Sequence, residues 1–245
     1  MSAIERASKV AIVTGGSQGI GLATVRALAG RGMLVVAMAR DQDRLDHAVG
    51  SLSPVLRDRV VGIVGDVSQD ASVASVVMAT KDRFGRIDVL VNSAGVSMTA
   101  KRSLANTTTD EWRRLIDTNL TGTYFMCREV LPYLSDNGGY ILNVLSTAAF
   151  RATAGVSLYA ASKSGARALT EALIDEYAGS GVRVTSVSPG PVDTTIWDHK
   201  LEPPSAEKRA EMLRPSDIAD IFVWLLDRPA RLHIRDITVT PWTNK

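Results

Sequence analysis

The sequence contains a single cysteine, Cys127, and only three histidines among its 245 residues. One cysteine excludes an intramolecular disulfide and any metal site built from several cysteines. The place of Cys127 in an apolar helical pattern favours simple burial over reactivity. The histidines, His47, His199 and His233, are too scattered in the sequence to suggest a metal site, so no metal is expected.

Long apolar and long basic segments are also missing. The longest continuous apolar stretch, residues 33–39, is far shorter than the ~18 residues that a membrane-spanning helix needs. Residues 1–9 carry charges but no apolar core of signal-peptide length, so we expect a soluble, cytoplasmic protein. With 28 basic against 26 acidic residues and no basic run longer than two, the composition argues against a nucleic-acid partner.

Short apolar runs alternate along the chain with segments of helical periodicity. Strands are predicted at residues 10–14, 34–39, 60–65, 89–92, 140–145, 183–188 and 237–240, and helices at 19–31, 41–52, 69–84, 108–134, 156–179 and 216–227. This alternation is typical of an α/β fold, a Rossmann-like doubly wound parallel sheet of about seven strands with helices on both faces. Because no linker or repeat interrupts it, we expect a single domain over residues 1–245.

A glycine-rich turn joins the first strand to the first helix, in the order Thr14-Gly15-Gly16-Ser17-Gln18-Gly19-Ile20-Gly21. Gly15 permits the tight turn, Gly19 lets the backbone approach a pyrophosphate, and Gly21 allows close helix packing. The helix start offers free N–H groups and a partial positive charge, to which Ser17 and Gln18 can add donors. The pattern predicts a dinucleotide site; the alternative is a strand-to-helix turn that binds no ligand.

Tyr159 and Lys163 are four residues apart in a predicted helix, and Ser146 lies thirteen residues before Tyr159 at a strand end. Residues at this helical spacing share a face, so the ammonium of Lys163 is expected near the phenol of Tyr159. A nearby cation favours phenolate, so we predict a lowered pKa for Tyr159. An isolated pair of this kind is more often part of a solvated helix face.

The pair is not isolated, because it belongs to a series of motifs. In chain order these are the glycine-rich turn, Asn92-Ser93-Ala94-Gly95, Asn119, Ser146, Tyr159-x-x-x-Lys163 and Pro189-Gly190. This set resembles the short-chain dehydrogenase/reductase family, in its shorter branch with the Gly-x-x-x-Gly-x-Gly spacing, from about residue 9 to 195. The resemblance implies a catalytic tetrad of Asn119, Ser146, Tyr159 and Lys163. Tyr159 would exchange a proton, Ser146 would stabilise the substrate oxygen, Lys163 would tune the phenol and bind ribose, and Asn119 would hold a relay water.

The resemblance also implies the contacts of a nicotinamide cofactor. They are Gly15, Ser17, Gln18, Gly19, Ile20, Gly21, Arg40, Asp66, Val67, Asn92, Ala94, Gly95, Tyr159, Lys163, Pro189, Gly190, Val192 and Thr194. Asp66 and Val67 would hold the adenine, although a carboxylate there also explains a helix cap. Val192 and Thr194 would meet the carboxamide, although two prolines around a glycine also make a plain rigid turn.

The end of the second strand indicates which cofactor is preferred. An acidic residue there would bind a ribose 2′-hydroxyl, whereas a nearby arginine accommodates a 2′-phosphate. The chain has Ala39 and then Arg40, so we predict NADP(H), with NAD(H) possible because Gln18 replaces the basic residue of some NADP-dependent members. Asp41 is expected to cap the next helix.

The expected reaction is hydride transfer between NADP(H) and a carbonyl or secondary alcohol; the alternatives are an NAD-dependent alcohol dehydrogenase and a non-catalytic nucleotide-binding regulator. Ser146, Tyr159, Arg151 and Trp197 are candidate substrate residues, the last in a substrate loop of about residues 193–214. Arg151 or Lys200 could bind an acidic substrate, although loop cations are more often solvated.

The ending Asp236 to Trp242 resembles that of NADP-dependent members acting on hydroxy-amino acids or small alcohols. It puts the family's usual tetramer in doubt, and we expect a homo-oligomer, a dimer or a tetramer.

Overall fold

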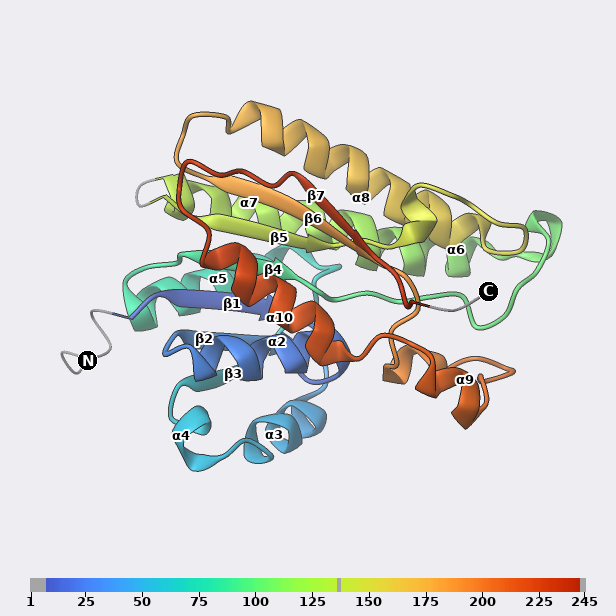
Figure 1. Ribbon diagram of the computed structural model, residues 1–245, viewed down its shortest axis with the longest axis horizontal. Helices are drawn as coiled ribbons and strands as arrows, with labels where there is room; N and C mark the ends of the chain where they lie inside the picture. Colours follow the sequence, from blue (N-terminus) through green and yellow to red (C-terminus); the bar gives the residue numbers. More distant parts are fainter. Residues whose placement is uncertain (1–7, 136–137, 243–245) are drawn as a thin grey trace.

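A single parallel sheet of seven strands forms the centre of the molecule (Figure 1). The computed structural model describes residues 8–135 and 138–242, so most of the segment tested above for a signal peptide lies outside it. The strands are β1 Val10–Thr14, β2 Leu34–Ala39, β3 Val60–Val64, β4 Val89–Asn92, β5 Tyr140–Val144, β6 Arg183–Pro189 and β7 Asp236–Val239. They run in the order β3-β2-β1-β4-β5-β6-β7, which confirms the predicted doubly wound sheet. The assignment of residues 1–245 to one domain remains a prediction.

Helices follow the strands in turn. They are α2 Gly19–Gly30, α3 Gln42–Gly50, α4 Pro54–Arg57, α5 Asp70–Phe84, α6 Thr109–Ile116, α7 Gly122–Ser135, α8 Ser157–Glu176, α9 Ala206–Ala210 and α10 Pro215–Leu226. Local chemistry sets several ends: Thr108 and Glu111 form a capping box on α6, and Gly85 ends α5 at φ 74°. None of the helices in the described ranges is long and apolar enough to cross a bilayer.

The predicted helix over residues 108–134 is wrong in one respect. The chain forms α6, then a π-helical segment, η2, at Asp117–Thr121, and then α7. A π turn places one extra residue in the helical ladder, which rotates the side chains that follow. Periodicity across the whole segment is close enough to 3.6 that the interruption does not show in the sequence.

Alternate residues of the strands enter two separate cores. Val10 and Ile12 of β1 pack with α5, α7 and α8, whereas Ala11 and Val13 pack with α2, α3 and α10. Both faces are therefore apolar, as a parallel sheet covered on both sides requires. On the second face α2 and α10 lie side by side (Figure 1).

The sheet reverses its order at β1. This strand pairs with β2 on one side and with β4 on the other, so the connections leaving β1 and β4 run to opposite faces. In doubly wound sheets, ligands bind at the carboxyl ends of the strands beside such a switch point. The predicted motifs lie at that edge: Gly15 and Ser146 follow β1 and β5, and Asn92 is the last residue of β4.

Candidate active site

The β1–α2 turn is built so closely that glycine is required at particular positions. A side chain on Gly21 would place its Cβ 2.1 Å from the carbonyl oxygen of Gly15, and one on Gly15 would lie 3.0 Å from Ala94. Gly15 and Gly19 also have positive φ values of 66° and 53°. The turn that opens α2 therefore carries no Cβ at these positions, and no acidic residue lies in the first turn of the helix.

The turn is tied to the segment after β4. The hydroxyl of Thr14 accepts hydrogen bonds from the N–H groups of Ser93 and Ala94, each at 3.0 Å. Asn92 is buried and donates to Asn143 of β5 at 2.9 Å, which braces the two strands. The bracing that we expected of Asn92 is present, and its contact with a cofactor remains a prediction.

Asn119 lies in the π turn and joins three parts of the chain. Its Oδ1 accepts from the N–H of Val96 at 2.9 Å, and its Nδ2 donates to the Val96 carbonyl at 2.9 Å and to Ser162 of α8 at 3.0 Å. The side chain is 1% exposed, so these bonds are shielded from water. The amide thus holds the segment after β4 against α8, while its role in a proton relay stays a prediction.

Ser146 and Tyr159 lie together, as their spacing suggests. Ser146 follows β5 and its hydroxyl accepts from the N–H of Ala148 at 3.1 Å, at the start of η3, Thr147–Ala149. Tyr159 is in the first turn of α8 and packs against a small cluster of Met98, Leu115 and Leu158. A hydrogen bond between Ser146 and Tyr159 lowers the pKa of the phenol, although burial has the larger, opposite effect.

Lys163 is 5% exposed, and its ammonium donates to the carbonyl oxygen of Val144 at 2.9 Å. The Nζ also lies near Gly95, since a Cβ built there would be 3.6 Å from it. Burial lowers the pKa of Lys163 to about 8. The buried amine therefore stands between the end of β5 and the segment after β4.

The predicted lowering of the Tyr159 pKa is wrong. Burial raises the pKa of Tyr159 above its ordinary value, and Ser146 offsets this only in part. The helical spacing fixes how close the two Cβ atoms come, but the amine of Lys163 is directed to Val144. Burial is the main cause of the pKa shift of Tyr159 and the cause of the pKa shift of Lys163.

Arg40 follows β2 with its side chain exposed, and it makes no hydrogen bond or ion pair within residues 8–135 and 138–242. A second cation lies close by: Nη1 of Arg44, in the first turn of α3, donates to Oε1 of Gln18 at 3.3 Å. Asp41 accepts from the N–H of Arg44 at 2.9 Å, so its predicted capping role is confirmed. The uncharged side chain of Gln18 thus contacts the guanidinium group of Arg44.

Asp66 and Val67 follow β3. The Oδ1 of Asp66 accepts from the N–H and the hydroxyl of Ser68, at 2.9 and 2.7 Å. This bond stabilises the turn before α5, whose N-cap is Gln69, so Asp66 itself is not the helix cap. Val67 buries its side chain in the core. Their contact with adenine remains a prediction.

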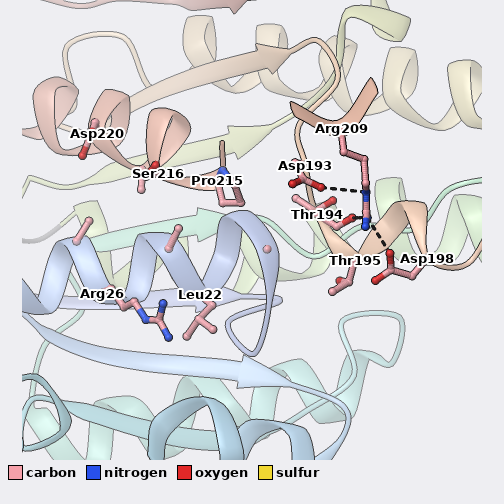
Figure 2. Close-up of a pocket in the computed structure, with 14 residues that line it drawn as sticks. Leu22, Arg26, Asp193, Thr194, Thr195, Asp198, Arg209, Pro215, Ser216 and Asp220 are labelled. Atoms are coloured by element: carbon pink, nitrogen blue, oxygen red, sulfur yellow. Dashed lines mark hydrogen bonds and ion pairs between the residues drawn. The ribbon is translucent and has the colours of Figure 1, made fainter. Parts of the chain in front are cut away.

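The loop after β6 closes against the glycine-rich turn. A Cβ on Gly19 would lie 3.2 Å from Cγ2 of Thr194, and Arg209 of α9 holds this loop through ion pairs with Asp193 at 3.1 Å and Asp198 at 2.7 Å (Figure 2). Arg209 also donates to the carbonyl of Thr194 at 2.9 Å. No motif in the sequence around Arg209 predicts that it holds this loop.

A pocket of about 690 Å³ lies beside this loop, between α2 and the start of α10 (Figure 2). Gly19 and Thr194, two predicted cofactor residues, line one part of it. Its lining does not include Ser146, Tyr159 or Lys163. The pocket therefore adjoins the expected pyrophosphate position rather than the catalytic residues.

The two predicted loop residues of the substrate site differ in their surroundings. Trp197 lies in η4, Thr195–Trp197, and its Nε1 donates to the carbonyl of Val192 at 2.8 Å. Arg151 is exposed, and its side chain makes no hydrogen bond or ion pair within the described ranges. Lys200, by contrast, is partly buried and crosses to the segment after β4, donating to Ser97 at 2.9 Å.

Comparison with known proteins gives concordant results. The family model described as short chain dehydrogenase matches residues 9–204. An uncharacterized oxidoreductase of Staphylococcus saprophyticus is 36% identical over 97% of this chain and 99% of its own. Among solved structures, an alcohol dehydrogenase from the archaeon Thermococcus sibiricus, complexed with 5-hydroxy-NADP, has a TM-score of 0.84 at 29% identity, covering 95% of this chain and 96% of that one. A 3-ketoacyl-(acyl-carrier-protein) reductase from Brucella melitensis, complexed with NADH, has a TM-score of 0.84 at 27% identity, covering 95% and 97%.

Proposed function

The chain belongs to the short-chain dehydrogenase family and is an NAD(P)-dependent oxidoreductase, and from this premise we propose that it transfers a hydride between NADP(H) and a carbonyl or secondary alcohol. The observation that carries the proposal is the meeting of Ser146, Tyr159, Lys163 and Asn119 around the carboxyl ends of β4 and β5. These are the groups that a reaction exchanging one proton at an oxygen atom requires.

The residues of the β1–α2 turn fit a dinucleotide. Close contacts at Gly15, Gly19 and Gly21 leave no room for side chains, and the start of a helix without acidic residues suits a pyrophosphate. The nicotinamide supplies the hydride when it is bound. The buried amine of Lys163 and the backbone around Ala94, Gly95, Pro189, Gly190, Val192 and Thr194 would hold the nicotinamide half.

NADP(H) is proposed over NAD(H) because two guanidinium groups, Arg40 and Arg44, flank the end of β2 where a 2′-phosphate would lie. The carboxylate next to Arg40, Asp41, caps α3 and lies 3.7 Å from Arg44. The relatives do not decide the question, since one solved structure holds an NADP analogue and another holds NADH.

Each catalytic group has a role that follows from its surroundings. A raised pKa keeps Tyr159 protonated near neutral pH, as a proton donor to a carbonyl oxygen requires. The hydroxyl of Ser146 would orient that oxygen and stabilise its developing negative charge. Lys163 and Asn119 would return a proton to the phenol, and Trp197 and Arg151 would border the substrate.

Two alternatives make different predictions. An NAD-dependent alcohol dehydrogenase would bind NADH more tightly than NADPH. A nucleotide-binding regulator would bind the cofactor and show no turnover, and the buried Lys163 beside a paired Ser146 and Tyr159 argues against it, because binding alone needs no proton donor.

The proposal is tested by a screen of ketones, aldehydes and alcohols followed by cofactor absorbance, with both cofactors. Tyr159→Phe should bind cofactor and stay folded but lose ~10²- to 10⁴-fold in turnover, the usual worth of a general acid. Tyr124→Phe, at a tyrosine 43% exposed on α7, is the matched control and should keep full activity. Near-normal turnover in a folded Tyr159→Phe variant would contradict the mechanism.

The proposal also includes a cytoplasmic location and a homo-oligomer, a dimer or a tetramer. The exposed edge of β7, with Trp242 beyond it and Trp224 on α10, offers apolar surface for a second copy. Light scattering after gel filtration measures the assembly, and a monomer at micromolar concentration would rule it out.

A further inference from the structure

Two cations, Arg114 and Lys200, bind the segment after β4, and a third, Lys101, belongs to that segment; we call these three residues the basic cluster. Nζ of Lys200 donates to Oγ of Ser97 at 2.9 Å and to the carbonyl of Met98. Nη2 of Arg114, in α6, donates to the carbonyl of Ser97 at 2.9 Å. Segments distant in the sequence are thus joined at Ser97 and Met98.

The segment that the basic cluster binds reaches the proposed catalytic tyrosine through Met98. Met98 is 2% exposed and packs in the same small apolar cluster as Leu158 and Tyr159. Lys101 packs against Gly155, in the loop that leads from Ser146 to α8. The cations therefore lie on a segment that contacts the cluster around Tyr159 and the loop between Ser146 and α8.

The charge of the basic cluster is not balanced. Burial, and then the positive charges of Arg114 and Lys101, lower the pKa of Lys200. Neighbouring cations have partners: Arg102 pairs with Glu111 at 3.2 Å and Arg209 with Asp193 at 3.1 Å. Within residues 8–135 and 138–242, Lys101, Arg114 and Lys200 form no ion pair. Cations held close together without a carboxylate attract an anion.

We propose that the basic cluster binds an anionic group of the substrate, a carboxylate or a phosphate ester, while the carbonyl or hydroxyl group lies at Ser146 and Tyr159. This inference rests on the proposed oxidoreductase function and narrows its substrate class to charged molecules. Lys200 is the central residue, because it is partly buried and has a third proton beyond its two hydrogen bonds to donate.

Anion binding is measured first without turnover, by calorimetric titration of the NADP⁺-loaded protein with butyrate, methyl phosphate and the neutral butyramide. Butyrate or methyl phosphate should bind at least tenfold more tightly than butyramide, and whichever binds identifies the anion. Lys200→Met should weaken that binding at least tenfold. Lys101→Met should weaken it to a smaller extent, because the Lys101 side chain, unlike that of Lys200, makes no hydrogen bond to Ser97 or Met98. Lys9→Met, at an exposed lysine that precedes β1 and lies away from the carboxyl ends of the strands, is the control and should change nothing.

Two outcomes of the titration would overturn the proposal: butyramide binding as tightly as both anions, or Lys200→Met leaving anion binding unaltered. Failure of both anions to bind would overturn it as well.

Turnover supplies the second arm, with 3-hydroxybutyrate against its methyl ester, 4-hydroxypentanoate against its methyl ester, and glycerol 3-phosphate against glycerol. In at least one pair the charged member should have a kcat/KM at least tenfold higher, and Lys200→Met should remove that preference while changing the neutral member less than twofold. Equal losses for both members would mean that Lys200 only anchors the loop. Anion binding without any turnover would refute the oxidoreductase function alone, whereas turnover without charge preference would refute the anion site alone.

Discussion

Lys163 is a buried amine, and its environment has a measurable effect on stability. Its ammonium has one carbonyl partner, Val144, and is otherwise removed from water. Burial lowers its pKa from the usual 10.5 to about 8, so the charged form is less favourable in the folded protein than in the unfolded chain. The residue proposed to serve the reaction thus lowers the stability of the fold at neutral pH.

Lys163→Met should therefore stabilise the protein at pH 7. One pKa step is worth about 1.4 kcal/mol, so the lowering of the Lys163 pKa corresponds to roughly 3 kcal/mol. Below pH 8 the amine is charged in both states and the cost is fully present. Between pH 8 and 10.5 the unfolded state binds more protons, so wild-type stability rises with pH and the advantage of the variant fades.

Urea unfolding of both proteins at pH 7 and at pH 10 measures this difference. Because other titrating groups are common to both proteins, they cancel in the comparison. A variant that is less stable at pH 7, or an advantage that grows with pH, would show that the charge of Lys163 is not destabilising. Lys163→Met should lose activity whichever of these stability results is found.

At the scale of elements, the β1–α2 turn depends on Gly21. Replacement of glycine by alanine inside a helix ordinarily stabilises it by about 1 kcal/mol. Gly21→Ala should instead destabilise the protein and abolish cofactor binding, since the new methyl group would lie 2.1 Å from the carbonyl oxygen of Gly15. Gly50→Ala, at the end of α3, is the matched control and should be neutral or stabilising, because a Cβ there would meet no residue beyond its own helix and chain neighbours within 4 Å.

Thermal unfolding and cofactor titration measure both glycine variants. If Gly21→Ala bound the cofactor normally, the close contact of helix and turn would not be what shapes the site.

The β2–α3 junction is expected to decide between the two cofactors. Ala39→Asp with Arg40→Ala should reverse a preference for NADPH, because a carboxylate would repel the 2′-phosphate and its cation would be gone. Arg44→Gln alone should weaken NADPH binding and leave NADH binding nearly unchanged, since the guanidinium lies beside Gln18. The ratio of the two dissociation constants is the measurement, and equal affinities in the unmodified protein would contradict the assignment.

At the scale of the whole molecule, a cofactor that joins both halves of the sheet should stabilise it. A ligand at 100 times its dissociation constant adds about 2.7 kcal/mol of stability. For a chain of this length that corresponds to a Tm increase of roughly 5 to 10 °C. NADP⁺ should give this increase with the wild-type protein and with Tyr159→Phe, and the increase should be absent with Gly21→Ala. The same increase in all three would place binding elsewhere.

Much of the arrangement could be predicted from the residues alone. Apolar runs and helical periodicity located the seven strands to within a residue or two at each end, since side-chain burial on a sheet is a local property of the pattern. The order of the motifs predicted which strand ends lie beside the candidate site residues, because parallel strands bring their carboxyl ends to one edge. Burial of Cys127 was confirmed, and that burial raises its pKa to about 12.

Only the tertiary structure decided where the long side chains end. The spacing of Tyr159 and Lys163 brings their Cβ atoms together, yet the amine is bound by Val144, and burial raises the pKa of the phenol. The π turn at Asn119, the pairing of Arg44 with Gln18, and the meeting of Lys200 with Ser97 are likewise absent from the pattern. Each depends on contacts between residues far apart in the chain, and desolvation, which sets the pKa values, depends on everything packed around a group. Periodicity and spacing relate residues that are near one another along the chain, so they determine the helices and strands. Contacts between residues far apart in the chain depend on how those helices and strands pack.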